Sequence, residues 1–181
     1  MIISKTGIIT FQFNRKIEMT DIKIRQLHSN DVHDFRTIRL SALKNNPEMF
    51  ASSYAIEVKK PLAVFQNVIT THTIFAAYHQ HKIVAMLILQ QNNDSNMIHQ
   101  ANLYGFFVEP DFRKQGIAKQ LLKTAIAYGQ TDLKCIMLSV MVDNIAAIQL
   151  YKTLGFKPHS NELKILNSNH YPSEISMIFN Y

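Results

Sequence analysis

The segment from residue 111 to residue 119 combines positive charge with small residues at a predicted strand-to-helix turn. It has the sequence DFRKQGIAK and follows a β-type run that ends at Pro110. A turn here directs the first backbone N–H groups of the helix outward, and the helix dipole favours an anion such as a pyrophosphate. Gly116 and Ala118 are small enough for a phosphate to approach the backbone closely. The positive charge is carried by Arg113, Lys114 and Lys119.

Two familiar phosphate-binding loops do not match this segment. The GxxxxGK[ST] pattern of the P-loop is missing, and the glycine spacing is not that of the dinucleotide-binding fingerprint. On these residues alone, a glycine that only eases a tight turn explains the segment equally well.

A second pair of polar residues, Asn144 and Tyr151, follows the apolar run from Cys135 to Val142. The two residues are seven positions apart, which places them on one face of a predicted helix. Tyr151 could therefore present its hydroxyl to a molecule that lies alongside. A half-buried tyrosine whose hydroxyl meets water or backbone is the alternative.

Apolar periodicity predicts the elements that position these residues. A first helix begins near Val32 and ends before Pro47, and residues 48–58 form a loop. Gln80 and His81 form a hairpin turn between two β-rich runs. The remaining helices are predicted at 62–69, 117–129 and 144–154, and the strands at 22–27, 72–79, 82–90, 98–109, 135–142, near Phe156 and at 174–181. The order β-α-α-β-β-β-α-β-α-β-β indicates one α/β domain.

The composition agrees with a folded domain and excludes several other classes. Of 181 residues, 47% are hydrophobic and 18% are charged, which excludes disordered and coiled-coil proteins. The longest apolar run, Ile83 to Leu89, is far shorter than the ~18 residues of a membrane span. The only cysteine, Cys135, excludes an intramolecular disulfide, so we expect a reducing cytoplasm. Residues 1–18 are interpreted as an extension without an assigned role, and residues 19–181 as the domain.

From about Ile22 to Tyr181 the chain resembles the GNAT superfamily of acetyl-coenzyme A-dependent N-acetyltransferases. The resemblance is carried by RQLHSNDVHDFRTIRLSAL with PEMFASSYAIE, by LYGFFVEPDFRKQGIAKQLL, and by LSVMVDNIAAIQLYKTLGFK. The family motif Q/R-x-x-G-x-G/A corresponds to residues 113–118, RKQGIA. N-x-x-A-x-x-L-Y-x-x-x-G-F follows at the expected distance, beginning at Asn144.

The resemblance implies a mostly antiparallel mixed α/β sheet with flanking helices, whose fourth and fifth strands splay apart around the pantetheine arm of acetyl-CoA. Asn144 would hydrogen-bond this arm, and Tyr151 would protonate the departing thiolate as general acid. A backbone N–H near Val108 would stabilise the oxyanion. The backbone of Phe106, Phe107 and Val108 would pair with pantetheine amides, and the pyrophosphate would be held by Arg113, Lys114, Gln115, Gly116, Ile117, Ala118 and Lys119.

The same resemblance implies an acceptor site for a primary amine, which must lose a proton before it attacks. Many relatives place a glutamate on the strand before the phosphate loop, but the corresponding stretch here is LYGFF at residues 103–107, and Glu109 adjoins Pro110 at the strand end. Glu57, Tyr104 and a water chain are the alternatives for the base. The acceptor region also includes Phe50, Ser53 and Tyr54, beside Ser52.

Several partners and alternatives follow from these features. The acceptor is expected to be a small molecule or a peptide, and relatives are often homodimers. No metal is predicted, because the eight histidines show no recognisable ligand spacing. The net charge of +6 permits a nucleic-acid binder, but a basic helix and an RNA-binding signature are missing, so neither nucleic acid nor a membrane is expected as a partner. The missing glutamate leaves open a non-catalytic acyl-CoA binding or sensing module.

Overall fold

The computed structural model describes residues 21–92, 94, 97–159 and 174–181. The proposed extension at residues 1–18 lies outside this part of the chain. Within it, the elements follow the predicted order, and seven strands form a single sheet in the order β1-β2-β3-β4-β5-β7-β6. The strands are β1 (Ile22–Gln26), β2 (Thr73–His79), β3 (Lys82–Gln91), β4 (Gln100–Val108), β5 (Cys135–Met141), β6 (Lys157–Pro158) and β7 (Glu174–Asn180).

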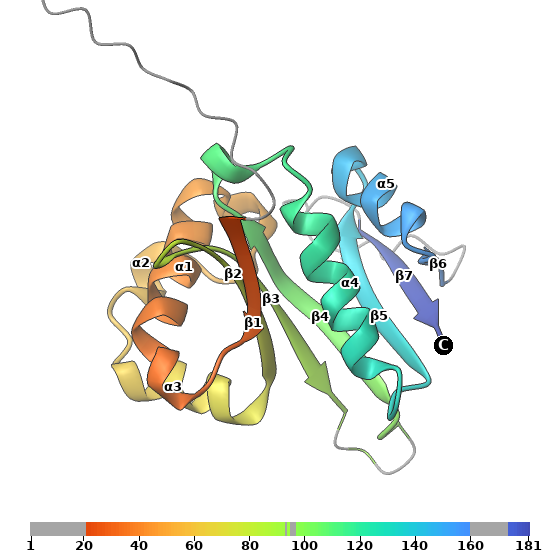
Figure 1. Ribbon diagram of the computed structural model, residues 1–181, viewed down its shortest axis with the longest axis horizontal. Coiled ribbons are helices and arrows are strands. Elements are labelled where there is room, and N and C mark those ends of the chain that lie inside the picture. Colours follow the sequence, from red (N-terminus) through yellow and green to blue (C-terminus); the bar gives the residue numbers. More distant parts are fainter. Residues whose placement is uncertain (1–20, 93, 95–96, 160–173) are drawn as a thin grey trace, which may run out of the picture.

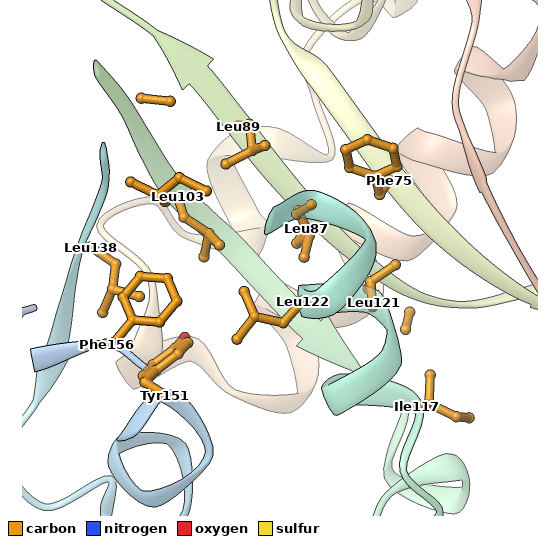
Figure 2. Close-up of a cluster of buried hydrophobic side chains, with 14 of the residues drawn as sticks. Phe75, Leu87, Leu89, Leu103, Ile117, Leu121, Leu122, Leu138, Tyr151 and Phe156 are labelled. Carbon is orange, nitrogen blue, oxygen red and sulfur yellow. The ribbon is translucent and has the colours of Figure 1, made fainter. Parts of the chain in front are cut away.

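Helices cover both faces of this sheet (Figure 1). On one face, α1 (Val32–Asn45) and α3 (Leu62–Thr71) enclose a core centred on Phe35, Ile38 and Met86. On the other face, α4 (Ile117–Gly129) and α5 (Ile145–Thr153) enclose the larger core. Figure 2 shows this second core, with Leu121 and Leu122 of α4 above the strands and Tyr151 rising from α5 beside Phe156.

The predicted loop at residues 48–58 is wrong in part, because two short helical segments lie there. A 3-10 turn covers Pro47–Met49, and the one-turn helix α2 covers Tyr54–Glu57. A single turn is too short to show an apolar period, so the sequence pattern did not reveal it. Its position is fixed instead by a contact between Glu57 and Arg39 of α1, described below.

The sheet is antiparallel except where β4 lies beside β5. These two strands are parallel, and they pair over only three positions, from Gln100–Cys135 to Asn102–Met137. Beyond Asn102 the strands separate, while β4 stays paired with β3 as far as Val108. The predicted splay between the fourth and fifth strands is thereby confirmed.

A β-bulge helps to turn β4 at the point of separation. The β3–β4 register shifts between Met86 and Ile88, opposite Gly105 on β4. Gly105 has a φ of 62°, a left-handed conformation that residues with a Cβ avoid. A Cβ at this position would lie 2.9 Å from Cδ1 of Ile88, so both the backbone angle and the neighbouring side chain require glycine.

Candidate active site at the splayed strands

A pocket of about 620 Å³ opens where β4 and β5 separate. Its walls come from α1, the segment around α2, the middle of β4, the second half of β5, the start of α5 and the start of β7. The residues that line it are Arg39, Met49, Phe50, Ala51, Ser52, Asn102, Leu103, Tyr104, Gly105, Phe106, Met137, Leu138, Ser139, Val140, Met141, Asn144, Tyr151, Glu174 and Ser176.

Strand alternation makes this pocket reach both faces of the sheet. On β5, Leu138 and Val140 belong to the core beneath α4 and α5. Ser139 and Met141 therefore point to the opposite face, beneath which α1 lies. Because residues from both sets line the pocket, it passes through the gap between the strands and joins the two faces.

Tyr151 stands at the α5 side of this passage. Its side chain is 6% exposed and packs against Phe156, and its ring centroid lies 6.3 Å from that of Phe106. Its hydroxyl has no hydrogen-bond partner among the described residues, although the residue lines the pocket. Burial raises the pKa of Tyr151 far above its usual value, so the phenol keeps its proton at neutral pH.

Asn144 lines the same pocket and caps α5. Its Oδ1 accepts a hydrogen bond from the backbone N–H of Ala147, at 3.2 Å, and its Nδ2 lies 3.8 Å from Sδ of Met49. The cap engages the oxygen of the amide, which leaves the nitrogen as a donor on the pocket side. The sequence prediction that Asn144 and Tyr151 face one site agrees with this placement.

The turn before α4 has an exposed, uncapped helix N-terminus. Gly116 precedes α4 with a φ of 83°, and Lys114 also has a left-handed φ of 59°. The first hydrogen bond of the helix runs from the N–H of Gln120 to the carbonyl of Gly116. The N–H groups of residues 117–119 therefore have no acceptor within the described chain, as the start of an uncapped helix requires. Lys114 and Lys119 are exposed beside them.

Arg113 lies at this turn, but its side chain is engaged with the protein. Its Nε donates to the carbonyl of Val108 at 2.9 Å, and its Nη2 donates to Oδ1 of Asn46 at 2.6 Å. The guanidinium also lies over the ring of Phe107. Arg113 therefore ties the end of β4 to the end of α1. Gln115 similarly donates to the carbonyl of Asp111, at 3.0 Å.

The backbone of β4 near the turn alternates between two directions. The N–H of Glu109 donates to the carbonyl of Val84, and Phe107 is paired with Met86 on β3. In an antiparallel ladder, the intervening residues direct their N–H and C=O groups to the other edge. The N–H of Val108 and the C=O groups of Phe106 and Val108 thus face the splay, while the backbone groups of Phe107 face β3. The carbonyl of Val108 is the one that accepts from Nε of Arg113. Phe106 lines the pocket, and Phe107 and Val108 do not.

On the opposite wall, Glu57 forms an ion pair with Arg39. Nη2 and Nε of Arg39 donate to the two carboxylate oxygens at 2.8 and 3.0 Å, and the side chains are 8% and 15% exposed. Burial alone would raise the pKa of Glu57, but the hydrogen bonds and charge of Arg39 lower it overall. Glu57 does not line the pocket, and both its oxygens are occupied, so the structure does not place it as the base.

Of the other acceptor-site candidates, two line the pocket and two do not. Phe50 and Tyr104 line the pocket, and the guanidinium of Arg39 lies 5.1 Å from the ring centroid of Phe50. Burial raises the pKa of Tyr104, with an opposing effect from Arg39, so its phenol keeps its proton. Ser53 and Tyr54 lie outside the lining, where Ser53 precedes α2 and Tyr54 is 39% exposed.

Sequence reasoning missed several lining residues, among them Arg39, Ser139, Glu174 and Ser176. Ser139 carries a usable signal, because it is the one polar residue in the apolar run of β5. Glu174 and Ser176 show none, since a terminal strand with alternating polar residues is also typical of an ordinary exposed face.

The described residues include no group of three or more histidine, cysteine or acidic side chains that could hold a metal ion. No helix among them has the length and apolar character needed to cross a membrane.

Comparison with known proteins identifies relatives of this chain. The model of the acetyltransferase (GNAT) family matches residues 40–156. The [ribosomal protein bS18]-alanine N-acetyltransferase of Salmonella typhimurium is 36% identical over 78 residues, which are 42% of this chain and 49% of the relative. The chain thus spans about half the length of the curated relatives it matches.

Solved structures share the fold over most of the chain. An acetyltransferase of the GNAT family from Streptococcus pneumoniae has a TM-score of 0.77 and 15% identity, covering 88% of this chain and 99% of that one. The ribosomal-protein-S18-alanine N-acetyltransferase from Escherichia coli has a TM-score of 0.63 and 21% identity, covering 88% and 93%. A protein from Salmonella typhimurium solved with its cofactor acetyl-CoA has a TM-score of 0.69 and 12% identity, covering 88% and 94%. With its family match, its splayed sheet and its open helix N-terminus, the chain belongs to the GNAT acetyltransferase family.

Proposed function

We propose that this protein transfers an acetyl group from acetyl-CoA to a primary amine of a small molecule or a peptide. The observation that carries the proposal is the pocket that joins the two faces of the sheet, with the unpartnered hydroxyl of Tyr151 on its wall. An acetyl donor on the α4–α5 face and an amine on the α1 face can meet there. Acetyl-CoA supplies an activated acetyl group as a thioester.

The residues at the start of α4 fit a pyrophosphate. Three backbone N–H groups, at residues 117–119, lack acceptors within the described chain and lie beside the exposed ammonium groups of Lys114 and Lys119. Charge-assisted hydrogen bonds to N–H groups at a helix N-terminus stabilise such an anion. Arg113 would act here mainly by fixing the turn, since Val108 and Asn46 engage its side chain.

The backbone at the splay fits an amide-bearing arm. The outward C=O of Phe106 and N–H of Val108 can pair with an extended amide chain, as strands do, and Nδ2 of Asn144 provides a further donor. The N–H of Val108 lies on the edge of β4 that faces β5, and it is the proposed donor to the oxyanion.

Tyr151 would hold the proton that the leaving thiolate needs. Its pKa is raised by burial, so it is a neutral phenol when the reaction begins and can donate as a general acid. Attack by the amine on the thioester is direct. Cys135 is buried at the far end of β5 with its pKa raised by burial, and it does not line the pocket, so it would not form an acyl-enzyme.

Several relatives are named for acetylating an alanine of ribosomal protein bS18. We therefore include the α-amino group of a peptide with an N-terminal alanine among the proposed acceptors. The pocket walls that would contact the acceptor come from α1, the α2 segment and β7.

The experiment that tests this proposal has two stages. Calorimetric titration with acetyl-CoA should give saturable one-site binding at micromolar concentrations. Release of free thiol should then be followed with a panel of primary amines, including a peptide with an N-terminal alanine. Tight binding without turnover by any amine would favour the non-catalytic acyl-CoA module, and no binding would overturn the proposal.

A further inference from the structure

The proposed reaction needs a group that takes a proton from the acceptor ammonium, and the pocket contains one carboxylate among its described lining residues. This is Glu174, the first residue of β7. Of the sequence candidates, Glu57 is bound to Arg39 outside the lining, and burial raises the pKa of Tyr104. A water chain would still need a group that finally takes the proton.

The register of β7 places Glu174 on the acceptor side of the splay. Glu174 is paired with Met141, and Ser176 with Ser139, and all four line the pocket. The intervening residue Ile175 packs against the core beneath α4 and α5. Strand alternation therefore turns Glu174 and Ser176 to the opposite face, which is the face reached by Ser139 and Met141.

The charges of the pocket walls favour an ammonium at Glu174. Arg39 is the lining cation in the described chain, and the carboxylate of Glu57 compensates its charge at 2.8 Å. Glu174 forms no ion pair among the described residues. The β7 side of the pocket thus combines one carboxylate with the hydroxyl oxygens of Ser139 and Ser176, all of which accept hydrogen bonds from an ammonium.

We infer that Glu174 is the general base of the acetyl transfer, an inference that rests on the proposed function. Its carboxylate accepts one proton from the acceptor ammonium, and the nitrogen lone pair then forms the C–N bond with the thioester carbon. The C–S bond breaks with its electron pair on sulfur, which takes the proton of Tyr151. The second proton lost by the nitrogen restores the Tyr151 phenol, and Glu174 releases its proton to solvent.

The test compares Glu174→Gln with Glu48→Gln, both in the full chain. Glu48 is exposed on the Pro47–Met49 turn and does not line the pocket, so it controls for the same change in charge and side-chain chemistry. The probes are acetyl-CoA and the amine that the wild-type protein acetylates. The measurements are kcat, the KM of the amine, the pH profile of kcat/KM, and the calorimetric Kd of acetyl-CoA.

We expect Glu174→Gln to lower kcat about 100-fold at pH 7, the range of general-base effects, with the Kd of acetyl-CoA unchanged. The deficit should shrink as the pH approaches the pKa of the amine in solution, because the amine then arrives neutral. Glu174→Asp should recover part of the activity, and Glu48→Gln should match the wild type.

Three results would overturn the inference. One is an unchanged kcat in Glu174→Gln, and another is a raised KM for the amine at unchanged kcat, which would make Glu174 a binding group only. The third is a 100-fold loss that is the same at every pH. The proposed function fails separately, when the wild-type protein binds no acetyl-CoA or acetylates no amine, and the inference falls with it.

Discussion

Replacing Glu57 by glutamine should destabilise the protein measurably, because it leaves the charge of Arg39 without its partner. The two side chains are 8% and 15% exposed and share hydrogen bonds of 2.8 and 3.0 Å. Removing one member of such a pair costs about 3 kcal/mol of unfolding free energy. For a chain of this length, that loss corresponds to a fall in Tm of roughly 6 to 12 °C.

The double replacement Arg39→Met with Glu57→Leu separates this ion-pair effect from packing. Apolar groups of similar volume replace a buried pair with little net change, so the double variant should lie within about 1 kcal/mol of the wild type. Urea denaturation followed by circular dichroism measures both variants. A Glu57→Gln protein as stable as the wild type would refute the reasoning, and so would a double variant less stable than the single one.

The same ion pair predicts how stability depends on pH. The pKa of Glu57 is lower in the folded protein than its unfolded value of about 4.3. The pair therefore stabilises the fold fully above about pH 5, and this contribution disappears as the pH falls through the folded pKa. The difference in unfolding free energy between wild type and Glu57→Gln should therefore become smaller as the pH falls from about 5 through the folded pKa of Glu57. A difference that stays constant with pH would contradict the stabilising role of the ion pair.

Three further substitutions test the donor side and the splay. Tyr151→Phe should lower kcat about 100-fold or more while the calorimetric Kd of acetyl-CoA and the Tm stay unchanged, because the lost hydroxyl has no partner in the described chain; equal turnover would remove its acid role. Gly116→Glu should weaken acetyl-CoA binding about 100-fold through charge repulsion at the helix N-terminus, whereas Gly116→Asn, which tolerates a φ of 83°, should bind nearly normally. Gly105→Ala should lower the unfolding free energy by about 1–3 kcal/mol in urea denaturation, since its φ is 62° and its Cβ would contact Ile88. The double variant Gly105→Ala with Ile88→Val removes the contact with Cδ1 of Ile88 but keeps the unfavourable φ. It should therefore regain only part of the lost unfolding free energy.

Most of the fold could be predicted from the sequence, because its elements are long and periodic. The hairpin at Gln80 and His81 and the strand at 135–142 were predicted, and the structure confirms both. The expectation that this strand is covered on both sides is wrong, because Ser139 is exposed and Met137 and Met141 are half-buried. In contrast, α2 has a single turn, and an ion pair across the chain fixes it. Contacts between residues 18 positions apart, such as Arg39 and Glu57, leave no local pattern.

The residues proposed to bind acetyl-CoA could be named from the sequence, whereas the residues proposed to surround the acceptor could be named only in part. Residues 113–118 form one short segment, and Asn144 and Tyr151 are seven positions apart. The spacing within each group is therefore visible in the sequence. The acceptor half combines α1, β4 and β7, whose residues meet only because β4 and β5 separate. The β5–β7 register pairs Glu174 with Met141 and Ser176 with Ser139, and no local pattern could reveal this pairing.

Successive side chains of β5 point to opposite faces of the sheet, so the residues on one face can change without changing those on the other. Ile136, Leu138 and Val140 belong to the core that holds α4 and α5, while Met137, Ser139 and Met141 line the proposed acceptor side of the pocket. A library that varies only positions 137, 139 and 141 should therefore search acceptor preference with little cost in folding. Under the proposed function, lineages of such proteins can diverge in the amines they modify by changing every second residue of one strand, while the half proposed to hold the acetyl donor stays intact.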